Sequence, residues 1–77
     1  MSDTVTKLAS ALAEDCLKVQ DASGEDRLFI ELGEVLGASS QTLEEAFLTE
    51  IRIRLAERGA RKFLTAKAAS LKAKPEG

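Results

Sequence analysis

Residues 42–58, TLEEAFLTEIRIRLAER, form the strongest helical pattern in the chain and carry apolar side chains on two faces. At about 100° per residue, one face consists of Phe47, Leu48, Ile51 and Leu55. The other consists of Leu43, Ala46 and Ile53, and a charged strip of Glu50, Arg54 and Glu57 runs between them. A helix with two apolar sides is typical of the middle of a bundle or of a subunit interface. The first face is therefore our candidate partner interface, and burial within a single chain is the alternative.

Three further helices are predicted around this segment. Residues 4–20 carry one apolar stripe at spacings of three and four residues, namely Val5, Leu8, Leu12, Cys16 and Val19. From this position we expect Cys16 to be a small buried apolar residue rather than a reactive thiol. Residues 25–36 and the Ala-rich residues 60–73 are the other two helices, although a short strand at 27–32 is an alternative to the former.

Small residues and caps predict where the helices end. Gly37 is placed as the residue that terminates the second helix. Thr42 and Glu45 have the spacing of a capping box at the start of the third, with Ser39 or Ser40 as an earlier alternative start. Gly59 is expected either to end the third helix or to kink it.

The four helical patterns predict an all-α fold, a small bundle of three to four helices. The chain has 77 residues, which makes residues 1–74 one helical domain, followed by a frayed tail at 75–77. A domain this small buries only about 60% of the surface that its unfolded chain exposes. The lone cysteine has no partner for a disulfide. Association with another chain is then the common remaining route to stability, and we expect a homodimer or a complex with another protein.

The same composition argues against several kinds of chemistry. The chain has no histidine and one cysteine, so we expect neither a metal site nor a histidine-dependent catalytic site. So short a chain has little room for an enclosed pocket, so we predict that it is not an enzyme and has no cofactor. No apolar run reaches the length of a membrane span, and no export signal is recognisable. A cytoplasmic location is the resulting expectation.

Charge is divided unevenly along the chain. Residues 1–38 hold eight acidic and three basic residues, a net charge of −5, whereas residues 39–77 hold five acidic and eight basic residues, a net charge of +3. The i,i+4 spacing of Glu50 and Arg54 predicts an ion pair, and Arg54 and Glu57 are a second possible pair. The candidate basic face for an acidic partner consists of Arg54, Arg58, Arg61 and Lys62. The alternative is a solvated tail whose bases pair in part with the acidic half.

Residues 29–48 resemble the helix-turn-helix pattern of bacterial DNA-binding proteins. Gly33, Gly37 and Leu43 have the spacing of that pattern, and Leu32, Leu36 and Ala46 match its apolar positions. The resemblance implies that Ser39, Ser40 and Gln41 face DNA, together with Glu44 and Glu45. The two carboxylates depart from the pattern physically, because affinity for DNA normally comes from Lys and Arg contacts to phosphate.

These observations lead to three hypotheses about function. The first is a non-enzymatic interaction or regulatory module that self-associates through its third helix. The second is a small DNA-binding regulator that uses residues 29–48, so nucleic acid is a less favoured partner. The third is an accessory subunit of a larger enzyme.

Overall fold

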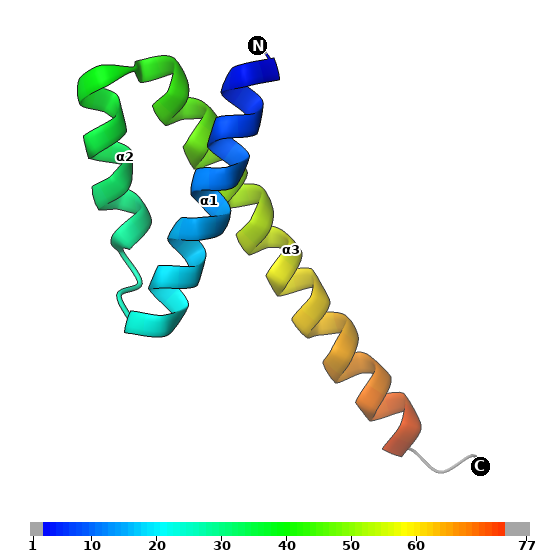
Figure 1. The fold of residues 1–77 in the computed structure, drawn as a ribbon. Coiled ribbons are helices and arrows are strands. Elements are labelled where there is room, and N and C mark those ends of the chain that lie inside the picture. The colour runs from blue at the N-terminus through cyan, green and yellow to red at the C-terminus, as the bar shows by residue number, and fades with distance from the viewer. Residues whose placement is uncertain (1–2, 74–77) are drawn as a thin grey trace.

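The computed structural model describes residues 3–73, and within this range the chain is all-α (Figure 1). Helix α1 spans Asp3–Ser23, α2 spans Leu28–Ser39 and α3 spans Gln41–Ala73. Helices α1 and α2 both pack against the first part of α3. The predicted small helical bundle is confirmed, with three helices in the described residues. The expected tail at 75–77 lies outside them.

The core lies where α1 crosses α3 and is built from small residues facing large ones. Ala9, Ala13, Cys16 and Leu17 of α1 are buried against Ala46, Phe47 and Ile51 of α3. Because alanine and cysteine side chains are short, the α1 backbone can approach the Phe47 ring and Ile51 closely. Helix α2 closes the core with partly buried residues, among them Phe29, Leu32 and Leu36.

Helix α1 ends later, and helix α2 begins later, than the sequence pattern predicted. Helix α1 continues to Ser23 instead of residue 20, and Gly24 follows it with a φ of 78°, a left-handed conformation in which its N–H donates to the carbonyl of Gln20 at 2.8 Å. Gly24 therefore terminates α1. The Gln20 side chain then accepts a hydrogen bond from the Phe29 N–H at 3.0 Å. Since residues 25–27 form a turn, α2 begins at Leu28 and not at residue 25.

The predicted stop at Gly37 is wrong. Helix α2 passes through Gly37 to Ser39, and a single residue, Ser40, joins it to α3. The Ser40 hydroxyl accepts a hydrogen bond from the Leu43 N–H at 3.1 Å, so Ser40 is the N-cap of α3. The predicted capping box at Thr42 is therefore wrong, and the earlier start is confirmed.

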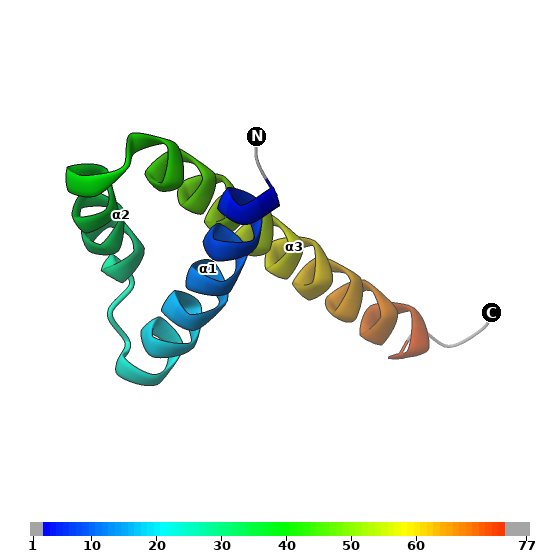
Figure 2. The ribbon, with the colours of Figure 1, turned by 45° about the horizontal axis from the view of Figure 1, so that its top comes forward.

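Helix α3 also passes through Gly59 without a break, so the segments predicted at 42–58 and 60–73 are one helix of 33 residues. No other element requires the chain to turn here. The i,i+4 pair of Glu57 and Arg61 spans the glycine, with Nη2 at 2.6 Å from the carboxylate. The second half of α3 extends past α1 and α2 into solvent (Figures 1 and 2). We call residues 59–73 the arm.

The arm makes the molecule elongated. The principal extents are 60 × 28 × 13 Å and the radius of gyration is 16.7 Å. A compact domain of this length has a radius of gyration of about 11–12 Å. The fold is therefore a compact three-helix body with a projecting helix.

Candidate interaction surfaces

The face predicted as the partner interface is mostly covered by the chain itself. Phe47 and Ile51 have no exposed surface and form the centre of the core. Leu48 is half-buried, and its Cδ2 would lie 3.4 Å from a Cβ added at Gly33 of α2. Leu55 is 38% exposed. The prediction is wrong for Phe47 and Ile51, because α1 and α2 already cover them.

Exposed apolar residues gather instead on the arm. Phe63, Leu64 and Leu71 are each 60–65% exposed. At about 100° per residue, these three residues and Ala60 lie along one side of the helix, and Lys67 falls between Phe63 and Leu71 on the same side. We call this side the apolar edge. The apolar edge was not among the predicted interfaces, which lay within residues 42–58, although its spacing is visible in the sequence.

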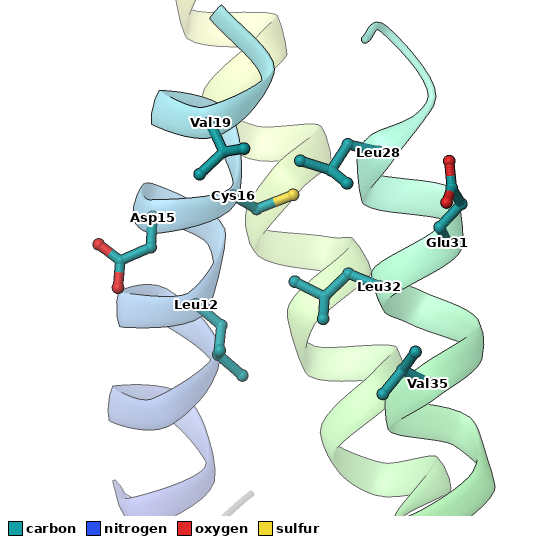
Figure 3. Close-up of a pocket in the computed structure, with 8 residues that line it drawn as sticks. All are labelled: Leu12, Asp15, Cys16, Val19, Leu28, Glu31, Leu32 and Val35. Atoms are coloured by element: carbon teal, nitrogen blue, oxygen red, sulfur yellow. The ribbon is translucent and has the colours of Figure 1, made fainter. Parts of the chain in front are cut away.

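A second apolar surface is the groove between α1 and α2, with a volume of about 380 Å³ (Figure 3). Aliphatic side chains from the two helices face each other across it, and Cys16 points into it from α1. Two carboxylates, Asp15 and Glu31, flank the aliphatic residues. The groove is lined by Leu12, Asp15, Cys16, Val19, Leu28, Glu31, Leu32 and Val35.

Several residues at this groove are more exposed than their place in an apolar stripe predicts. Val35 is 65% exposed and Val19 is 54% exposed, and the neighbouring Leu8 of α1 is 52% exposed. The stripe on α1 is wider than α3 can cover, so its outer edge is left beside α2. An apolar groove with exposed valines is a typical feature of protein interaction sites.

The predicted basic face is largely neutralised within the chain. Arg54 pairs with Glu50, as its spacing predicted, and its Nη2 donates to the Ser10 hydroxyl at 2.7 Å, whereas Glu57 pairs with Arg61 instead. Arg58 pairs with Asp21 at 2.9 Å. Lys62 is exposed. Three of the four residues therefore have an intramolecular partner, and the basic character is stronger further along the arm, at Lys67 and Lys72.

The residues that the helix-turn-helix resemblance placed against DNA sit at the corner between α2 and α3. Ser39 and Gln41 are exposed, and the Ser40 hydroxyl is engaged in the cap of α3. Gly37, which the pattern places in the turn, lies inside α2, where a Cβ would meet the Glu44 carboxylate at 2.9 Å. The corner therefore differs from the expected turn and presents carboxylates.

Cys16 is buried, as expected, with 4% of its surface exposed. Burial removes water from the thiol and raises its pKa, because the thiolate is poorly solvated there. Within residues 3–73, no group of His, Cys, Asp and Glu side chains is arranged to hold a metal ion. None of the described helices combines the length and apolar character needed to cross a membrane.

No protein-family model, curated protein or solved structure matches this chain. The features of the described residues that bear on function are the groove, the arm and their charges.

Proposed function

We propose that this chain is a small non-enzymatic helical module that acts by associating with another protein chain, and that its first partner is a second copy of itself. The observation that carries the proposal is the amount of exposed surface. The chain exposes 5815 Å². A compact monomer of 8.3 kDa is expected to expose about 4,600 Å². The excess, about 1,200 Å², compares with the roughly 800 Å² that each partner contributes to a standard interface.

The chemistry of the two uncovered surfaces supports a protein partner. Both the groove and the apolar edge are lined by aliphatic or aromatic side chains, the groups whose burial drives helix association. An aliphatic groove of this kind accepts the apolar face of a helix. The module is proposed to act in the cytoplasm, because its single thiol suits a reducing compartment.

The charges at the corner between α2 and α3 favour a protein partner over DNA. Glu44 and Glu45 lie where the helix-turn-helix resemblance would place groove-facing residues, and neither Ser39 nor Gln41 offsets their charge. Duplex DNA is a polyanion, so two carboxylates at its surface oppose binding. The arm, in contrast, suits an acidic protein surface. Association as an accessory subunit of a larger enzyme would use these same two surfaces.

Sedimentation equilibrium of the full chain over the micromolar range tests the proposal. We expect the mass to rise from 8.3 kDa towards twice that value with concentration. A mass that stays monomeric up to near-millimolar concentration would contradict self-association. A parallel titration of mixed-sequence duplex DNA at low salt tests the alternative. Phosphate contacts are strongest at low salt, so binding that Gln41→Ala weakens would favour the DNA hypothesis over ours.

A further inference from the structure

We propose that two copies of this chain exchange their arms, so that the apolar edge of one copy lies in the groove between α1 and α2 of the other. This inference rests on the proposed self-association and specifies which two surfaces meet. It requires that the groove and the arm be complementary in charge, length and apolar character, and that the competing arrangements be less favourable.

The groove and the arm carry opposite charges. Residues 59–73 contain no acidic residue and four basic ones, of which Arg61 pairs with Glu57, while Lys62, Lys67 and Lys72 give the arm its basic character. The helices that form the groove, with the turn between them, span residues 3–39 and hold eight acidic and three basic residues. Asp15 and Glu31 line the two rims of the groove, with their carboxylates pointing outwards from the space between α1 and α2 (Figure 3). A basic helix seated there therefore meets carboxylates on both α1 and α2, an arrangement that favours encounter and orientation.

The two surfaces also match in length. The apolar edge extends from Phe63 to Leu71, about 12 Å along the arm at 1.5 Å per residue. The groove side of α1 extends from Leu12 to Val19, about 10 Å by the same measure. The Phe63 ring and the two leucines of the edge can then contact the exposed valines of the groove, so that both surfaces lose water together.

A chain cannot fill its own groove in this fold. Helix α3 is unbroken, and the arm points away from α1 and α2 (Figures 1 and 2). To reach the groove of the same molecule, α3 would have to break and reverse near Gly59. A second copy supplies the same helix with no such cost, and exchange between two copies gives each a filled groove.

Direct pairing of two arms is opposed by charge. Two arms side by side would bring together six lysines, Lys62, Lys67 and Lys72 of each copy, with no acid from residues 59–73. Like charges at short range destabilise such a pair. Placing each arm against the acidic helices of the other copy replaces this repulsion with attraction.

The test uses one variant on each surface. Leu64→Glu places a carboxylate on the apolar edge, facing the acidic groove, and Val35→Lys places a base in the groove, facing the basic arm. Both side chains are more than 60% exposed, so neither substitution disturbs the core. Because each buries an unfavourable charge, we expect each to raise the dissociation constant about tenfold or more. Thr65→Glu and Ile30→Lys are the matched controls, at exposed positions that lie about 100° from Leu64 around α3 and about 140° from Val35 around α2, and both should associate nearly as the parent chain does.

Mixing the two variants is the decisive measurement. The Leu64→Glu chain keeps an intact groove and the Val35→Lys chain keeps an intact arm, so a 1:1 mixture can form one good arm–groove contact. We expect a heterodimer, detected by sedimentation with one chain labelled, at concentrations where neither variant associates alone. Circular dichroism confirms that each variant is folded.

The outcomes separate this inference from the proposed function. If the parent chain associates but the mixture stays monomeric, or either variant associates as the parent does, the exchange of arms is wrong while self-association stands. If the parent chain remains a monomer at all concentrations, both proposals fail.

Discussion

The guanidinium of Arg58 donates two hydrogen bonds to the carboxylate of Asp21, from Nη1 to Oδ1 at 3.1 Å and from Nη2 to Oδ2 at 2.9 Å. These bonds join the last turns of α1 to α3 immediately before the arm begins. Asp21 raises the pKa of Arg58, mainly through this hydrogen bonding and secondly through its negative charge. The pair therefore marks the boundary between the packed part of α3 and the projecting part.

Removing the Arg58–Asp21 ion pair should weaken the packing of α1 against α3 only slightly. Both side chains are about half exposed, so water and salt screen the pair. We expect Arg58→Ala to lower the urea midpoint by a small amount at low salt and by less at high salt. Arg61→Ala is the control, because Arg61 pairs with Glu57 of the same helix. Equal effects of the two substitutions, or an effect of Arg58→Ala that grows with salt, would contradict this role.

Arg54 should matter more, because it links two helices from a partly buried position. Its side chain is 27% exposed, and that of Glu50, its partner, is 23% exposed. Arg54→Ala would leave the Glu50 carboxylate and the Ser10 hydroxyl without this donor. We expect a loss of about 1–3 kcal/mol in the free energy of unfolding, measured with urea. Arg52→Ala, at an exposed position of the same helix, should be nearly neutral, and an equal loss there would disprove the special role of Arg54.

Phe47 and Phe63 provide a matched pair of positions on α3. Phe47 is fully buried and Phe63 is 65% exposed. We expect Phe47→Ala to cost about 3–5 kcal/mol, enough to unfold a domain of this size, and Ile51→Val to cost about 0.5–1.5 kcal/mol in the same core. Phe63→Ala should leave the stability of the monomer unchanged and weaken association. A large loss of monomer stability in Phe63→Ala, measured by urea unfolding at low protein concentration, would mean that the arm is packed against its own chain.

Substitution by alanine should lower the free energy of unfolding at Gly24 and raise it at Gly59. Gly24 has a φ of 78°, which an alanine adopts at a cost of about 1–2 kcal/mol. Gly59 lies inside α3 with no atom within 4 Å of an added Cβ. Gly59→Ala should stabilise the helix there by up to about 1 kcal/mol. Urea unfolding should show the loss at Gly24, and circular dichroism at 222 nm should show a gain in helicity for Gly59→Ala. A loss of helicity there would contradict an unbroken α3.

Because the Cys16 thiol is buried, we expect the stability of the fold to depend on pH in the alkaline range. Its pKa is raised in the folded chain, so folding favours the protonated form. This contribution to stability is complete below the pKa of the unfolded thiol and is lost as the pH rises through the folded pKa. We expect the urea midpoint of the parent chain to fall in mildly alkaline solution relative to that of Cys16→Ala. Alkylation of Cys16 should also be slower in the folded chain than in urea, and equal rates would show that the thiol is accessible.

The helical class and part of the core could be predicted because they depend on local spacing. The stripe of residues 4–20 placed Cys16 on the buried side, and the spacing of Glu50 and Arg54 gave their ion pair. The ends of the helices were harder, because a glycine such as Gly37 or Gly59 weakens a helix without stopping it. Whether a helix ends at a glycine depends on the structure around that glycine. Helix α1 ends at Gly24 because the chain turns there towards α2.

The surfaces could not be assigned in the same way, because periodicity shows that a face is apolar and not which element covers it. Phe47 and Val35 both lie on apolar stripes, yet only Phe47 is buried. The difference arises because α1 and α2 are spread over α3 and leave the outer edges of their own stripes beside each other. That arrangement depends on the angles between helices, which single-sequence patterns do not contain.

The continuity of α3 through Gly59 has a mechanical consequence. The tip of the arm lies about 33 Å from Ile51, in the crossing with α1, at 1.5 Å per residue, so a tilt of α3 by about 10° at that crossing moves the tip by about 6 Å. Helix α3 would then move as a rigid rod that pivots at its crossing with α1. A change in the core that tilts α3 by this angle would then displace Leu71, on the apolar edge, by about 5 Å.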